Sequence, residues 1–192
     1  MREYDQIADW YAKQRGGSTG VPELRRLCAE LGEGARVLDV GCGTGHPLTG
    51  VLVDAGCRVT GLDSSSKMLA HFRVNFPELE TIHAPIESAA LPEARFEAAV
   101  AWGVLFHLDH DAQATALATL ARALVPGGRL LFTAGTEHGM HQGAPMNGVP
   151  FRYWSYATEG YRELLARHEL ELERVSEDVG GNTYYWSRHR AR

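Results

Sequence analysis

The sequence of 192 residues is poor in cysteine and has no long apolar run. Cys28, Cys42 and Cys57 are too few and too irregularly spaced to indicate a disulfide framework or a clustered cysteine metal site. The longest apolar run, at 98–106, is too short to span a bilayer, and the first ten residues lack the order of a signal peptide. These absences predict a soluble protein of the cytoplasm with no membrane partner.

Positive charge is also scarce. Lysine and arginine number 19 against 24 aspartates and glutamates, which gives a formal net charge of -5. A chain with this charge creates no broad field that attracts a polyanion, and the basic letters RHRAR at its end indicate a solvated tail. We therefore expect no nucleic-acid partner. The sequence does not indicate the oligomeric state.

Strand-like and helical patterns alternate through most of the chain. Short apolar segments at 36–40, 57–62, 81–83, 97–102 and 129–134 are separated by helical stripes. One such stripe is Leu24, Leu27, Cys28 and Leu31, which has the i, i+3, i+4, i+7 spacing of an amphipathic helix. This alternation predicts a parallel sheet flanked by helices, in one domain over 21–192.

Three segments depart from this alternation. Residues 1–20 predict an arm, a short amphipathic helix followed by the flexible stretch RGGSTG. Residues 135–156 are long, rich in glycine and aromatic residues, and predict a loop that acts as a lid. The segments ELERVSED and TYYWSRH flank a glycine turn, which predicts an antiparallel hairpin and one reversed strand at the end of the sheet.

The stretch VLDVGCGTGHP at 37–47 predicts a strand, a glycine-rich turn and a helix, the arrangement that binds ligands at the edge of an open sheet. A triphosphate loop needs a lysine and then a hydroxyl residue, where this chain has His46 and Pro47. The dinucleotide fingerprint needs a glycine in place of His46, so an NAD-dependent oxidoreductase is the weaker alternative. Asp39, inside the strand end, suits an ammonium group.

The motif VLDVGCGTG, followed by VTGLDSSSKML, resembles the first two motifs of the class I S-adenosylmethionine (SAM)-dependent methyltransferases. The segments IADWY, LPEARFEAAVAWGVLFHL and LARALVPGGRLLFT extend the resemblance over nearly the whole chain. It implies a Rossmann-like, doubly wound α/β sheet of seven strands, mostly parallel with an antiparallel last strand. It also implies an enzyme that moves a methyl group from SAM to oxygen or nitrogen of a small molecule and leaves S-adenosylhomocysteine (SAH).

The resemblance also implies a cofactor site. The backbone of the glycine turn would clasp the methionine part, and Asp63 would accept hydrogen bonds from both ribose hydroxyls, unless it only caps a helix. Met68 and Ile86 would flank the adenine, although both also suit a core. The family often has an acid where this chain has Pro85, so Glu87 is its expected substitute. The cofactor residues so implied are Tyr11, Arg15, Asp39, Gly41, Cys42, Gly43, His46, Asp63, Ser64, Met68, Ile86, Glu87, Ala101 and Phe106.

For the acceptor side, His107 follows the fourth predicted strand and is the candidate general base, with a purely structural histidine as the alternative. The histidine pairs of this chain lack neighbouring ligands, so we expect no metal. A SAM-binding regulatory protein without turnover is a further alternative. The predicted substrate-binding residues, each of which suits loop packing equally well, are His138, His141, Arg152, Trp154 and Tyr156.

Overall fold

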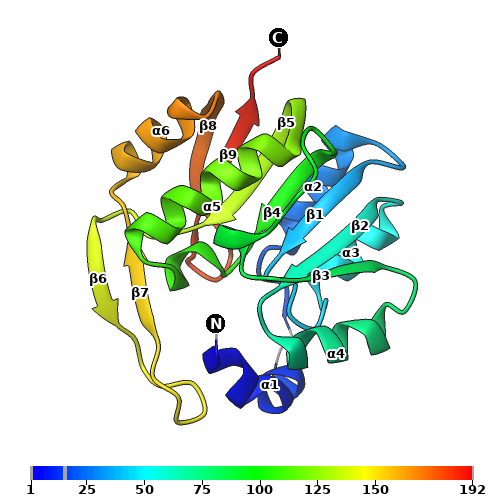
Figure 1. Cartoon of the computed structure of the whole chain (residues 1–192), viewed down its shortest axis with the longest axis vertical. Coiled ribbons are helices and arrows are strands. Elements are labelled where there is room, and N and C mark those ends of the chain that lie inside the picture. Colours follow the sequence, from blue (N-terminus) through cyan, green and yellow to red (C-terminus); the bar gives the residue numbers. More distant parts are fainter. Residues whose placement is uncertain (1, 15–16, 192) are drawn as a thin grey trace.

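The computed structural model describes residues 2–14 and 17–191 and consists of one large sheet, one small sheet and helices around them (Figure 1). The helices are α1 (Arg2–Gln14), α2 (Val21–Leu31), α3 (Leu48–Asp54), α4 (Ser66–Asn75), α5 (His110–Ala123) and α6 (Thr158–Arg167), with the 3-10 turns η1 (Ile86–Ser88) and η2 (Leu105–His107). The strands are β1 (Arg36–Val40), β2 (Arg58–Asp63), β3 (Glu80–His83), β4 (Phe96–Ala101), β5 (Leu124–Thr133), β6 (Gly139–Gln142), β7 (Arg152–Ser155), β8 (Leu170–Glu177) and β9 (Thr183–His189).

The large sheet has seven strands in the order β3-β2-β1-β4-β5-β9-β8. Strands β1 to β5 are parallel, whereas β9 is antiparallel to both of its neighbours. The predicted fold class is thus confirmed, with one difference of detail. The reversed strand is the last in the chain but lies second from the edge, because β8 forms the edge of the sheet and β9 pairs between β5 and β8. The order changes direction between β1 and β4, the position at which open sheets of this kind bind ligands.

The core lies on both faces of the sheet because successive side chains of a strand point to opposite sides. Leu130 joins a cluster with Leu117 of α5 and Leu165 of α6, whereas the next residue, Leu131, joins Leu52 of α3 on the other face. Helices α5 and α6 therefore cover one face, and α2 and α3 cover the other (Figure 1). Strands buried on both faces explain the continuous apolar runs of the sequence.

Side-chain caps define where two of the helices begin. Ser65 precedes α4 and its Oγ accepts a hydrogen bond from Met68 N at 3.1 Å. Asp109 precedes α5 and its Oδ1 accepts from Ala112 N at 2.9 Å. The second cap starts the helix before the segment 112–124 that its apolar stripe predicts.

Two elements lie beyond the carboxyl ends of the parallel strands (Figure 1). One is α1, which packs on α4. The other is a hairpin of β6 and β7 within 135–156, paired from Gly139 with Ser155 to Gln142 with Arg152. The sequence predicts only a loop for this segment and not the hairpin within it, because a mostly exposed hairpin lacks the alternation of apolar side chains by which a strand is predicted. In the described part of the chain, none of the helices is long and apolar enough to cross a membrane.

Candidate active site

A cavity, which we call the first cavity, opens at the carboxyl ends of β1, β2 and β4, where the strand order changes direction. Its walls come from the glycine turn after β1, the ends of β2 and β4, the turn η1 and helix α1. The residues that line it are Tyr4, Tyr11, Asp39, Val40, Gly41, Cys42, Gly43, Thr44, Gly45, His46, Leu48, Leu62, Asp63, Ser64, Met68, Ala84, Pro85, Ile86, Glu87, Trp102, Gly103, Val104 and Leu108.

The amide groups of the glycine turn are used within the chain itself. Gly41 N and Cys42 N donate to Leu62 O at 2.6 and 3.1 Å, and Gly43 N donates to Asp63 Oδ2 at 2.9 Å. Each of these three amides therefore already has a hydrogen-bond partner within the chain. A phosphate needs several free, convergent N–H groups, so this turn is poorly suited to a phosphate group.

The glycines of the turn are needed for different reasons. Gly41, at φ 64°, and Gly45, at φ 86°, lie so close to Val104 and Phe76 respectively that an added Cβ would overlap those side chains. At Gly43 the nearest atom to an added Cβ is Gly41 O at 3.9 Å, which leaves open space. Gly41 and Gly45 are therefore required by packing within the chain, whereas Gly43 leaves room for a ligand in the cavity.

Asp63 ends β2 and is 8% exposed. Its Oδ2 accepts from Gly43 N, and its Oδ1 accepts from Ser65 N at 2.8 Å. Burial raises the pKa of this carboxyl above its usual value, against the effect of the two backbone hydrogen bonds. Ser65, not Asp63, caps α4. Each carboxylate oxygen keeps a further lone pair, so the pair can accept from two adjacent hydroxyls of a ligand.

The far end of the first cavity is apolar, with one acceptor. Met68 and Ile86 are 1% and 3% exposed and both line the cavity. Glu87 follows Ile86, and its Oε2 is buried with no hydrogen-bond partner in the described part of the chain. A buried acceptor without a donor is costly, so this oxygen suits a ligand that brings an N–H group.

The lining of the first cavity is negative. Asp39, Asp63 and Glu87 contribute carboxyl groups, and no lysine or arginine occurs among the lining residues that the structure describes. Asp39 Oδ2 accepts from Thr49 Oγ1 at 2.5 Å, which fixes its orientation. Burial, and then the charge of Asp39, raise the pKa of the Cys42 thiol far above its usual value, so the thiol is not a nucleophile. The cavity thus favours a cation and disfavours phosphate.

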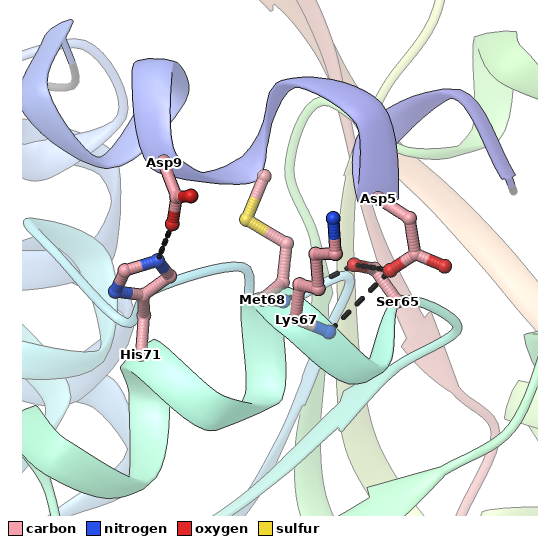
Figure 2. A network of polar contacts seen from close by, with 6 residues as sticks. All are labelled: Asp5, Asp9, Ser65, Lys67, Met68 and His71. Carbon is pink, nitrogen blue, oxygen red and sulfur yellow. Dashed lines mark hydrogen bonds and ion pairs between the residues drawn. The ribbon is translucent and has the colours of Figure 1, made fainter.

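Helix α1 is attached to α4 by polar contacts (Figure 2). Asp5 Oδ1 accepts from Ser65 Oγ at 2.6 Å and from Lys67 N at 3.4 Å. Asp9 Oδ1 lies 2.9 Å from His71 Nε2, but this aspartate side chain is 82% exposed, so its pairing contributes little. Ser65 also donates its backbone N–H to Asp63. One residue therefore links the attachment of α1 to the carboxyl group of the first cavity.

A second cavity of about 550 Å³ adjoins the first. Tyr4, Tyr11, Trp102 and Gly103 line both cavities, so the two meet beneath α1. The second cavity lies between α1, η2, the β6–β7 hairpin and the ends of β5 and β9. Its lining residues are Tyr4, Tyr11, Thr19, Trp102, Gly103, Phe106, His107, Thr133, Ala134, Gly135, His141, Met146, Tyr153, Ser155, Gly181, Asn182 and Thr183.

His107 lies in η2 on the wall of the second cavity. Its Nε2 is 3.0 Å from Tyr4 Oη, which joins the arm to the body of the domain. Burial lowers the pKa of His107 to about 4, so the ring is uncharged at neutral pH. An uncharged imidazole nitrogen can accept a hydrogen bond, here from the hydroxyl of Tyr4, a residue that lines both cavities.

The structure brings most of the predicted site residues together. Of the predicted cofactor residues, those that line the first cavity are Tyr11, Asp39, Gly41, Cys42, Gly43, His46, Asp63, Ser64, Met68, Ile86 and Glu87. Of the predicted acceptor residues, His107 and His141 line the second cavity. Arg15 is outside the residues that the structure describes.

Several predicted positions differ. Ala101 is fully buried in the core and is not part of either lining, and Phe106 lines the second cavity instead of the first. His138 stacks on His110, with ring centroids 4.3 Å apart, and Tyr156 donates its hydroxyl hydrogen bond to His110 O at 2.8 Å. His138 and Tyr156 thus pack the hairpin onto α5, which is the loop-packing alternative that the sequence left open for them.

Arg152 and Trp154 also lie elsewhere than predicted. They line a third hollow together with Glu3, His107, Gln142, Pro150 and Phe151, outside the lining of the second cavity. In the paired strands β6 and β7 successive side chains point to opposite sides, so Tyr153 faces the second cavity while its two neighbours do not.

Other lining residues were missed by sequence reasoning. Tyr4 lies seven residues before Tyr11, so the two share one face of α1, and that spacing was the available signal. Trp102 directly follows β4, at the sheet edge where ligands bind. Thr133 ends β5 at the same sheet edge and had the same signal, whereas Asn182 and Tyr153 had none, because only the tertiary arrangement of β9 and the hairpin places them there.

Comparison with known proteins identifies methyltransferases by both sequence and structure. A family model described as a methyltransferase domain matches residues 37–128. A probable S-adenosylmethionine-dependent methyltransferase of Mycolicibacterium smegmatis is 30% identical over 152 residues, which cover 78% of this chain and 56% of that protein. A trans-aconitate 2-methyltransferase of Azoarcus sp. is 33% identical over 172 residues, which cover 78% of this chain and 66% of that protein. The chain therefore spans less than two thirds of the length of each of these relatives.

A solved structure shares the fold. The Burkholderia thailandensis 1,6-didemethyltoxoflavin-N1-methyltransferase, crystallised with 1,6-didemethyltoxoflavin and S-adenosylhomocysteine, superposes with a TM-score of 0.69 at 25% identity. The match covers 89% of this chain and 77% of that chain.

Proposed function

We propose that this chain, which belongs to the class I SAM-dependent methyltransferases, binds SAM in the first cavity and methylates a small molecule held in the second. The observation that carries the proposal is the chemistry of the first cavity. Three carboxyl groups, one of which has a buried oxygen without a hydrogen-bond partner, suit a cationic nucleoside, and the described lining has no lysine or arginine.

The residues fit each part of this cofactor. Asp63 has free lone pairs for the two ribose hydroxyls, and Glu87 Oε2 has no donor until the adenine amino group supplies one. Met68 and Ile86 would provide apolar walls for the adenine ring, and Asp39 would interact with the ammonium group. These assignments are our proposal for the roles of the lining residues.

When bound, the cofactor supplies a methyl carbon on a sulfonium, and the departing sulfur keeps the bonding electrons as the thioether of SAH. The chain supplies position and exclusion of water. Tyr4 and Tyr11 cover the junction of the two cavities, so that acceptor and methyl group meet away from solvent. The Tyr4–His107 pair would receive the acceptor's proton only in step with methyl transfer, because the lowered pKa of His107 makes its ring a weak base.

The other candidate functions have less support. An NAD-dependent oxidoreductase has to hold a pyrophosphate, for which the first cavity offers neither a cation nor free amides of Gly41, Cys42 and Gly43. A binding protein without turnover would not need the adjoining cavity of about 550 Å³. Two of the similar proteins, the trans-aconitate 2-methyltransferase and the 1,6-didemethyltoxoflavin-N1-methyltransferase, are named for small-molecule acceptors, whereas others are named for acyl-carrier-protein or tRNA acceptors. A cytoplasmic location accords with the three free, buried cysteines.

Isothermal titration calorimetry with SAH and NAD tests the cofactor. We expect SAH to bind and NAD not to bind. Replacing Asp63 by alanine should weaken SAH binding by at least about tenfold, because two hydrogen bonds to a charged group are lost. The control is Asp54→Ala, on an exposed side chain at the end of α3, which should bind SAH as the wild type does. Binding of NAD in preference to SAH would contradict the proposal.

A labelled-methyl screen then tests turnover. The purified protein is incubated with methyl-labelled SAM and metabolites of a cell extract below about 1 kDa, and labelled products are separated by chromatography. We expect a labelled small molecule that is absent with the Asp63→Ala protein. SAH binding without labelled product from any fraction would favour the binding protein without turnover.

A further inference from the structure

We propose that the acceptor is an uncharged, planar aromatic or heteroaromatic compound and that the second cavity excludes carboxylates. This inference rests on the proposed function, since it names the substrate class of the same site. It is drawn from the side chains that line the second cavity and from their contacts with one another.

The first observation is a continuous wall of rings. Tyr4 is 5.4 Å from His107 between ring centroids, and His107 is 4.8 Å from Phe106 and 5.1 Å from Tyr153. His141 continues the wall at 5.3 Å from Tyr153. The rings come from α1, η2 and the two strands of the hairpin, so distant parts of the chain build one surface. Such a surface binds flat apolar ligands by stacking and edge contacts.

The second observation is the absence of charge. None of the lining residues that the structure describes is an aspartate, glutamate, lysine or arginine. His107 is uncharged at neutral pH because burial lowers its pKa to about 4. Arg152 is a neighbour of Tyr153 in sequence but lines the third hollow. A carboxylate moved from water into this cavity would lose its hydration without gaining a cation, which is strongly unfavourable.

The third observation is that hydrogen-bonding side chains elsewhere in the lining are neutral. Thr133 Oγ1 accepts from Gly103 N at 2.8 Å and keeps its own proton to donate to a ligand. Asn182 is held by its amide group on Asp178, at 2.9 Å to Oδ2, so its position on the wall is fixed. Neutral donors and acceptors of this kind recognise ring nitrogens, carbonyls and hydroxyls.

The test is a calorimetric comparison of two matched probes on the protein saturated with SAH. The probes are 2-naphthol and 6-hydroxy-2-naphthoate, which differ by one carboxylate, at about pH 8, where exposed histidines are neutral. We expect 2-naphthol to bind at least about tenfold more tightly. Equal binding, tighter binding of the carboxylate, or no binding of 2-naphthol would overturn the inference. Failure of SAH itself to bind would instead overturn the proposed function.

Two variants assign the binding to this cavity. Tyr153→Ala removes one ring of the wall and should weaken 2-naphthol binding by about tenfold, whereas Tyr156→Phe, outside the lining, should not. Met146→Arg places a cation on the half-buried loop side of the cavity, where folding is least affected. It should shift the preference toward 6-hydroxy-2-naphthoate by about tenfold or more. An unchanged preference in Met146→Arg would contradict the explanation by charge.

Discussion

At the residue scale, the glycines of the turn after β1 have two different roles, one in packing within the chain and one in leaving space for a ligand. Gly41 touches Val104 of the chain, whereas Gly43 borders open space in the first cavity. The sequence motif identifies both as glycines that a ligand site requires. Only the structure shows that a side chain at Gly41 would clash with Val104 of the same chain. The reason is that Val104 lies 63 positions later and reaches the turn through the sheet.

This difference predicts that alanine substitutions at the two glycines act mainly on different properties, stability at Gly41 and ligand binding at Gly43. Gly41→Ala should lower the free energy of unfolding by roughly 2–4 kcal/mol, because the Cβ overlaps Val104 and the backbone is left-handed. Gly43→Ala should cost only about 1–2 kcal/mol for its left-handed backbone, yet weaken SAH binding more than its stability loss explains. Urea unfolding and calorimetry measure the two effects. A stable Gly41→Ala protein would contradict the packing assignment.

His107 predicts a pH dependence whose sign follows from its lowered pKa. In the folded protein the His107 ring becomes protonated only near pH 4, whereas in the unfolded chain it becomes protonated near the ordinary histidine pKa of about 6.5. Stability from this group is therefore complete above about pH 6.5 and is lost as the pH falls toward 4, by on the order of 3 kcal/mol. Urea unfolding of the wild type and of His107→Gln over this range should show the difference.

The titration itself is visible by NMR. The ring proton resonances of His107 should shift near pH 4, and the pH dependence of kcat/KM should show no limb near pH 6.5 from this residue. Titration of His107 near pH 6.5 would contradict the burial of its ring.

At the element scale, the attachment of α1 determines how the two cavities are covered. Asp5 makes the contact that matters most, because its hydrogen bond to Ser65 is partly buried whereas Asp9 is largely in solvent. Helix α1 in turn holds Tyr4 and Tyr11 over the junction of the cavities. Loss of one carboxyl group on α1 should therefore affect the site without affecting the core.

Asp5→Ala is the variant that tests this. Amide hydrogen exchange in residues 2–14 should become faster, and SAH binding should weaken roughly tenfold from loss of a hydrogen bond to a charged group. Exchange in β1 and β4 should not change. Gln6→Ala, on an exposed position of the same helix, is the control. Exchange in α1 that is equal in the two variants would show that the Asp5 contact does not hold the helix.

The elements also show what sequence reasoning reaches and where it stops. Helices and strands with a periodic apolar face, such as α2 with Leu24 and Leu27 buried, were predictable within a few residues. The β6–β7 hairpin was not, because all four residues of β6 are exposed and no pattern of burial marks them. The placement of His138 and Tyr156, which flank the hairpin, depends on how its ends pack against His110 of α5, and no sequence pattern gives that contact.

At the scale of the whole molecule, fold and cofactor chemistry were predictable, because the order of the motifs along the chain fixes which strand ends meet at one edge. The place of β9 between β5 and β8 was not, since a hairpin signal gives the pairing of two strands but not the side on which they join the sheet. The chemistry of the second cavity also emerges only here, because α1, η2, the hairpin and β9 all contribute to it.

The charge of the whole molecule and of the first cavity predicts a difference between SAM and SAH. The chain has a formal net charge of -5, and Asp39, Asp63 and Glu87 line the cavity. SAM carries one more positive charge than SAH. Raising the salt concentration from about 0.05 to 0.5 M screens the attraction of this charge to the carboxyl groups, so SAM binding should weaken a few-fold. SAH binding should change little. Calorimetry at several salt concentrations measures both, and equal salt dependence would contradict a role for the carboxyl groups.

The central claim is that the first cavity holds the cofactor, with its sugar at Asp63 and its adenine at Glu87. A crystal structure of the protein soaked with SAH measures this directly. We predict density in the first cavity with both ribose hydroxyls within hydrogen-bond distance of the Asp63 carboxylate and the adenine amino group on Glu87 Oε2. Density for SAH elsewhere, or in this cavity with neither contact, would contradict the account.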